Sequence, residues 1–124
     1  MGKYQEFDRL AAVEFGDIVV STQDLGHKLR VYLVDTSFID LYLSTSLKIT
    51  RFSIHWERGH LKKGFYRLDN TPDPDWKKVA SFPLHFHQKS YSRVLTSPFT
   101  GKSIENYFRQ FLSFAQSKIL SGKK

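Results

Sequence analysis

Three short runs of this chain alternate apolar and polar residues, which is the period of a β-strand with one buried face. The runs cover residues 51–57, 65–69 and 82–87, and turn-forming residues separate them. We therefore expect antiparallel neighbours in one sheet that has an apolar face and a polar face. The side chains expected on the apolar face are those of Phe52, Ile54, Trp56, Tyr66, Leu68, Phe82, Leu84 and Phe86.

The rest of the chain adds strands before these runs and a helix at each end. Residues 17–45 contain further β-rich runs divided by turn-like segments. Apolar stripes at helical spacing predict one helix that ends near Gly16 and a longer C-terminal helix. A chain of 124 residues is long enough for one core. We predict a single α+β domain over 1–124, with a helix at 1–16, an antiparallel sheet of about five to six strands at 17–95, a loop at 70–80 and a helix at 103–121.

The charge of the chain is concentrated in its second part. The formal net charge is +7, yet residues 1–50 hold 5 Lys and Arg against 7 Asp and Glu, a net charge of −2. Residues 51–124 hold 14 against 5, a net charge of +9. A positive field attracts polyanions, so the expected partner is RNA, DNA or an acidic protein.

Cations and aromatics of this basic part are the candidates for contact with nucleic acid, because exposed aromatics stack on unpaired bases beside cations that neutralise phosphates. These residues are Arg51, Arg58, Lys62, Lys63, Trp76, Lys77, Lys78 and Lys89. A basic solvated surface without a partner is the alternative interpretation of the same charges.

The chain contains no cysteine, which excludes disulfides, thiolate nucleophiles, zinc fingers and iron–sulfur clusters. The first ten residues lack the apolar core of a signal peptide, and no stretch approaches the roughly 20 apolar residues of a membrane span. We expect a cytoplasmic protein with no membrane association and no cofactor.

Alternation places a set of charged and imidazole side chains on the polar face of the predicted sheet. The set is Arg51, His55, Glu57, Arg67, Asp69, His85 and His87. Histidines beside Arg and Asp can supply what RNA transesterification needs: a base for the 2′-hydroxyl, an acid for the leaving oxygen and a cation for the phosphorane charge. The same residues would equally make hydrogen bonds and ion pairs on an ordinary solvated surface.

A metal site and a phosphate loop are two further interpretations. His85 and His87 lie two apart on a strand and so share a side, with His55 or Asp69 as a third ligand. We rank this site below the metal-free one. The segment 100–103, TGKS, resembles the end of a P-loop but lacks its first glycine, so it predicts a helix start.

Together, the segments 52–58, 66–72 and 82–87 resemble the TumE-type toxin-like family of small archaeal and bacterial proteins, which carries an HW-E-R, a Y/W-R-x-DN-x-P and an F-P-x-H-x-H segment in this order. The resemblance runs from about Asp35 to Leu120. It departs from the family pattern at Asp73, where members usually carry His, and at Leu84, where they often carry His or Lys. It implies a toxin–antitoxin setting with a small helix-turn-helix antitoxin as partner.

The resemblance divides the motif residues by role. His55, Arg67, His85 and His87 are the candidate catalytic residues, and Asp69 and Asn70 would form a turn or support them from behind. We therefore expect a toxin that acts on RNA, with metal-independent cleavage by His and Arg. The alternatives are a non-catalytic module that binds nucleic acid or a partner through the basic half, and a His-based metal-dependent hydrolase. A homodimer is the remaining partner considered.

Overall fold

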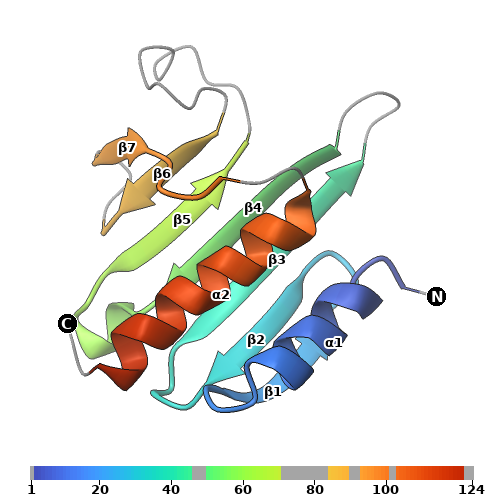
Figure 1. Ribbon diagram of the computed structural model, residues 1–124, viewed down its shortest axis with the longest axis horizontal. Helices are drawn as coiled ribbons and strands as arrows, with labels where there is room; N and C mark the ends of the chain where they lie inside the picture. Colours follow the sequence, from blue (N-terminus) through green and yellow to red (C-terminus); the bar gives the residue numbers. More distant parts are fainter. Residues whose placement is uncertain (1, 46–49, 71–83, 90–92, 101–102, 122–124) are drawn as a thin grey trace.

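A seven-stranded antiparallel sheet forms the centre of the protein in the computed structural model, which describes residues 2–45, 50–70, 84–89, 93–100 and 103–121. The strands pair in chain order, β1 to β7, so each lies beside its neighbours in sequence (Figure 1). Their bounds are β1 Val19–Asp24, β2 Leu29–Leu33, β3 Phe38–Thr45, β4 Thr50–Glu57, β5 Phe65–Asp69, β6 His85–Gln88 and β7 Val94–Thr96, with a short 3-10 helix, η1, at Gly59–Leu61.

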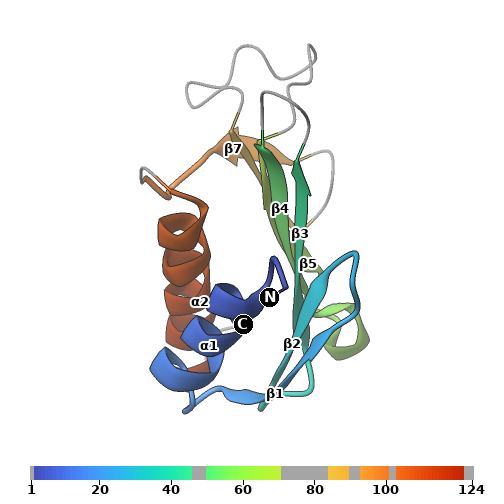
Figure 2. The ribbon, with the colours of Figure 1, turned by 90° about the vertical axis from the view of Figure 1, so that its right-hand side faces the viewer.

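Both helices pack on the same face of this sheet (Figure 2). Helix α1, Gln5–Glu14, lies over β1 and β2, and α2, Ile104–Leu120, runs obliquely across the middle strands (Figure 1). The two helices meet at Phe7 and Phe108, whose ring centroids are 5.5 Å apart. In the part of the chain that the structure describes, neither α-helix lies on the opposite face of the sheet. None of the helices in the described part of the chain is long and apolar enough to cross a membrane.

The predicted α+β class and its two helices are confirmed, and the sheet has one strand more than the six at most that we expected. The added strand, β7, is only three residues long, too short for alternation to reveal it, and pairs with β6. Ser103 caps α2 by accepting a hydrogen bond at Oγ from the backbone N–H of Asn106 at 3.1 Å, which agrees with a helix start at TGKS. The predicted loop at 70–80 lies almost wholly outside the described residues.

Aromatic side chains fix strands β4 to β6 under α2. The rings of Trp56, Tyr66 and Phe86 stack in sequence, with centroids 5.5 and 6.0 Å apart. Phe114 of α2 stands edge-on to each of these rings at 5.1–6.1 Å. The expected apolar face is therefore buried where it is described, although Leu84 is only partly so; Phe82 lies outside the described residues. This packing sets the register of the three strands that carry the polar motif residues.

Candidate functional site

Polar side chains form a row straight across the helix-free face. Direct register joins Arg30 of β2 to Asp40, Asp40 to His55, His55 to Arg67, and Arg67 to His87 of β6. The Cβ atoms of directly opposed residues on one face lie about 5 Å apart, so each side chain of the row is next to the following one. The sheet thus brings three of the four predicted catalytic residues into one line.

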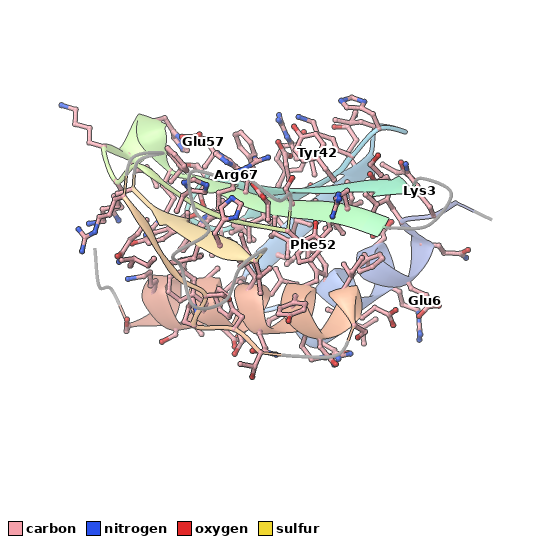
Figure 3. All side chains as sticks on the ribbon, turned by 90° about the horizontal axis from the view of Figure 1, so that it is seen from above. Lys3, Glu6, Tyr42, Phe52, Glu57 and Arg67 are labelled. Atoms are coloured by element: carbon pink, nitrogen blue, oxygen red, sulfur yellow. The ribbon has the colours of Figure 1, made fainter. Side chains whose placement is uncertain are left out.

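The view in Figure 3 separates the two faces of the sheet. It shows Tyr42, Glu57 and Arg67 on the side away from the helices, and Phe52 on the side that faces α2. Phe52 stacks there on Tyr107 with 5.6 Å between centroids. The polar face is therefore the one open to a partner.

Asp40 anchors one end of the row. Its side chain is 6% exposed and accepts hydrogen bonds from Arg30 Nε and Nη2 at 2.8 and 2.9 Å and from Lys28 Nζ at 3.0 Å. Burial acts to raise the pKa of Asp40, but the hydrogen bonds from Arg30 and Lys28 outweigh it, so the pKa lies below its ordinary value. Asp40 is consequently ionised at neutral pH.

His55 lies in the centre of the row. Its Nε2 is 3.0 Å from Glu57 Oε1, and its ring stacks on Phe65 with 4.9 Å between centroids. Burial lowers the pKa of His55 from its ordinary value; the hydrogen bond with Glu57 and the charge of Asp40 act against this, while Arg67 lowers it further. His55 is thus mainly neutral at pH 7 and able to accept a proton.

A second group of residues lies beside Arg67, at the β5–β6 pair. Asp69 is in direct register with His85, and Asp69 Oδ1 lies 3.2 Å from His85 Nε2. Arg67 Nε is 3.3 Å from the other carboxylate oxygen, Oδ2. The rings of His85 and His87 are 5.0 Å apart at 80° to each other. One ligand atom from each of Asp69, His85 and His87 lies within 4.8 Å of the others, and all three residues are buried, at 4–7% exposure.

Two open hollows lie on this polar face. The larger, of about 250 Å³, is lined by Arg30, Phe38, Asp40, Tyr42, His55, Glu57 and Arg67. The second, of about 150 Å³, is lined by Tyr42, Ser44, Arg51, Phe52, Ser53 and Arg67. Because Tyr42 and Arg67 line both, the two hollows adjoin along the face, and His55 and Arg67 are the predicted catalytic residues that a bound molecule would reach there.

The predicted nucleic-acid contacts fall in different places. Arg51 lines the second hollow. Lys62, Lys63 and Lys89 gather at the other end of β4 to β6, where Gly64 packs tightly against Lys89. Trp76, Lys77 and Lys78 lie outside the described residues, as does the departure at Asp73.

Arg58 does not belong with these surface cations. Its side chain is buried, at 1% exposure of the residue, and its guanidinium lies over the Trp56 ring at 4.1 Å. Nη2 donates to Asp35 Oδ2 at 3.1 Å. Alternation continued past Glu57 places Arg58 on the apolar face, so burial rather than charge decides its role, and it is not placed to contact a phosphate.

Asn70 has a structural role here. Its Oδ1 accepts a hydrogen bond from the backbone N–H of Phe52 at 2.8 Å, which closes the end of the β4–β5 pair next to Asp69. Sequence reasoning had not included Arg30, Asp40 and Tyr42, which come from the mildly acidic first part of the chain. Their signal was the alternation of polar residues with Leu29, Val31, Ile39 and Leu41.

Comparison with known proteins supports the family that the motif segments resemble. The chain matches the model of a protein family described as Toxin TumE over residues 5–119, which is nearly the whole sequence. No curated protein and no solved structure matches it. The family resemblance read from the three motif segments is therefore confirmed, and it extends further toward the N-terminus than those segments do.

Proposed function

The chain belongs to the TumE toxin family, and we propose that it acts as a toxin by cleaving RNA at the polar face of its sheet. Family membership implies an antitoxin as partner. A helix-turn-helix form of that antitoxin and a homodimer of the toxin stay predictions from the sequence.

The observation that carries the proposal is the row of His55 and Arg67 in direct register beside an open hollow. A base and a cation lie next to each other where an RNA strand can reach them. Lys62, Lys63 and Lys89 at one end of β4 to β6 and Arg51 at the other supply positive charge along the path of a polyanion.

The chemistry divides among these groups. Neutral His55 accepts the proton of a ribose 2′-hydroxyl, whose oxygen then attacks the adjacent phosphorus. The new 2′-oxygen–phosphorus bond forms as the bond from phosphorus to the 5′-oxygen breaks, which leaves a 2′,3′-cyclic phosphate and a 5′-hydroxyl. Arg67 stabilises the charge that develops on the phosphoryl oxygens. A proton must also reach the leaving 5′-oxygen.

The metal-independent reaction expected from the sequence gives this last proton transfer to His85 or His87. Both side chains are buried, and His85 is held against Asp69. Neither histidine is among the residues that line the hollow beside His55 and Arg67. We therefore expect a group bound by Asp69, His85 and His87 together, and not one of the two imidazoles, to give the proton to the leaving 5′-oxygen.

The test is cleavage of a labelled RNA oligonucleotide by the purified full chain, freed of antitoxin. We expect products ending in a 2′,3′-cyclic phosphate and no cleavage of the DNA of the same sequence, which lacks the 2′-hydroxyl. His55→Gln and Arg67→Gln should each lower the rate by about 10²- to 10⁴-fold. His60→Gln is the matched control, because His60 is exposed and contacts Thr36 instead of the hollow.

Intact RNA after prolonged incubation with folded protein would contradict the proposal. If that protein still binds the RNA, with affinity that falls steeply with salt and is unchanged in His55→Gln, the chain is a non-catalytic binding module.

A further inference from the structure

Asp69, His85 and His87 lie together because of strand geometry alone. Residues two apart on a strand point to the same side, which places both imidazoles of β6 on the polar face. Direct register then sets Asp69 of β5 opposite His85. Among the described residues, this is the group whose ligand atoms converge most closely: one oxygen and two ring nitrogens within 4.8 Å of one another.

Two imidazole nitrogens and one carboxylate oxygen are a donor set that proteins use for first-row transition metals. Bonds of about 2.0–2.1 Å to the ion put neighbouring ligand atoms roughly 3.0–3.4 Å apart. The Asp69 Oδ1 to His85 Nε2 distance of 3.2 Å falls in this range. The His87 ligand atom lies within 4.8 Å of the other two. Three protein ligands would leave coordination positions for water, as in catalytic rather than structural metal sites.

The surroundings of Asp69 also suit a metal ligand. Arg67 Nε lies on Oδ2, at 3.3 Å, so the other oxygen, Oδ1, faces the histidines. Ligating carboxylates are commonly held in this way by a second hydrogen-bonding group, which fixes their orientation. All three residues are buried, so packing restricts the side chains that carry the ligand atoms.

We propose that Asp69, His85 and His87 bind one divalent transition-metal ion of the Zn²⁺ or Mn²⁺ kind. This inference deepens the proposed function, and only the role of the ion rests on that function. In that role, a water on the ion would give its proton to the leaving 5′-oxygen of the RNA. The ion would then lie on the far side of Arg67 from His55, with the phosphate between the base and the acid. Metal binding itself does not depend on RNA being the substrate.

The test uses the full chain without a histidine tag, stripped with a chelator and dialysed. Zn²⁺, Mn²⁺ and Co²⁺ are titrated separately by calorimetry, and bound Co²⁺ is followed by its visible absorption. We expect about one ion per chain, with affinity lowered by about 100-fold or more in Asp69→Asn and in His87→Gln. His60→Gln should bind as the wild type does, because His60 is exposed and contacts Thr36 instead of this group.

A second measurement guards against variants that fail to fold. An ion that binds only the folded state raises the melting temperature of the wild type, and the rise should disappear in Asp69→Asn. The inference is overturned if none of the ions binds stoichiometrically, or if binding and stabilisation are the same in folded Asp69→Asn and His87→Gln as in the wild type. The Asp69–His85 contact would then serve only to hold β5 and β6 together.

The failures of the two proposals are distinguishable. RNA cleavage that persists in the chelator-treated protein, with no metal bound, keeps the proposed function and removes the metal. A stoichiometric ion without any RNA cleavage keeps the metal site and removes the proposed function.

Discussion

Replacing Asp40 by Asn tests the electrostatics of the polar face, because it removes one negative charge and keeps the shape of the side chain. The carboxylate is 6% exposed and accepts two hydrogen bonds from Arg30 and one from Lys28, at 2.8–3.0 Å. An amide has only one oxygen and no charge to offer them. The substitution therefore leaves two cations without their counter-ion on a partly buried surface.

The size of the effect follows from that burial. Breaking a buried ion pair by removing one partner costs about 3–5 kcal/mol. Lys28 and Arg30 retain 14% and 25% side-chain exposure, so water compensates part of the loss. We expect Asp40→Asn to lower the free energy of unfolding by about 2–3 kcal/mol, or the melting temperature by roughly 10 °C.

The pH dependence has a definite sign. The pKa of Asp40 in the folded protein lies below its ordinary value. The stability that Asp40 contributes is therefore fully present above the pKa of the unfolded chain, about 3.9, and is lost as the pH falls through the lower folded value. The difference between wild type and Asp40→Asn should be constant from pH 5 to pH 8 and shrink toward pH 3.

The assay is urea unfolding followed by tryptophan fluorescence at several pH values. Asp17→Asn is the matched control: it removes the same charge at an exposed carboxylate that contacts Gln116, and should change the free energy by less than about 0.5 kcal/mol. A loss below about 0.5 kcal/mol in Asp40→Asn at pH 7, or a difference that does not shrink in acid, would refute the reasoning. The freed cations should also strengthen RNA binding and steepen its salt dependence.

Two further predictions concern β4. Because the pKa of His55 lies below its ordinary value, the rate of a reaction that uses His55 as base should rise with pH through a pKa below about 6.5 and then level off, and this limb should vanish in His55→Gln. A rate profile in which the limb persists in His55→Gln would show that His55 is not the base. Trp56→Phe should lower the free energy of unfolding, measured in urea, by about 2–4 kcal/mol, because it leaves a cavity in the core and removes the 2.8 Å hydrogen bond from Nε1 to Ser37 Oγ. A loss under about 1 kcal/mol would show that the surrounding side chains collapse onto the smaller ring.

Most of the fold could be predicted from the alternation of apolar and polar residues, because the geometry of a β-strand imposes a period of two. It placed Ile54, Trp56 and Leu68 in the core, and it placed His55 and Arg67 together on the polar face. It failed at short or special positions. The three residues of β7 are too few to show a period, and the helices' choice of one shared face is set by packing between residues distant in sequence.

The sequence predicted which residues form the candidate site better than it predicted how deeply they are buried. Polar residues on an uncovered face are expected to be solvated, yet His85, His87 and Asp69 are buried. The role of Asp40 was also missed, because the charge balance of residues 1–50 drew attention to the second part of the chain. Pairing of β3 with β4 joins the two parts, and no count of residues along the chain reveals that contact.

The position of α2 after all seven strands sets the order of events during synthesis. The stack of Trp56, Tyr66 and Phe86 has no cover until Phe114 has left the ribosome. At about 5–20 residues per second, the 17 residues of α2 add roughly one to three seconds during which the polar strands lack their support. We therefore expect the polar face to reach its final register only after α2 has packed on the opposite side of the sheet.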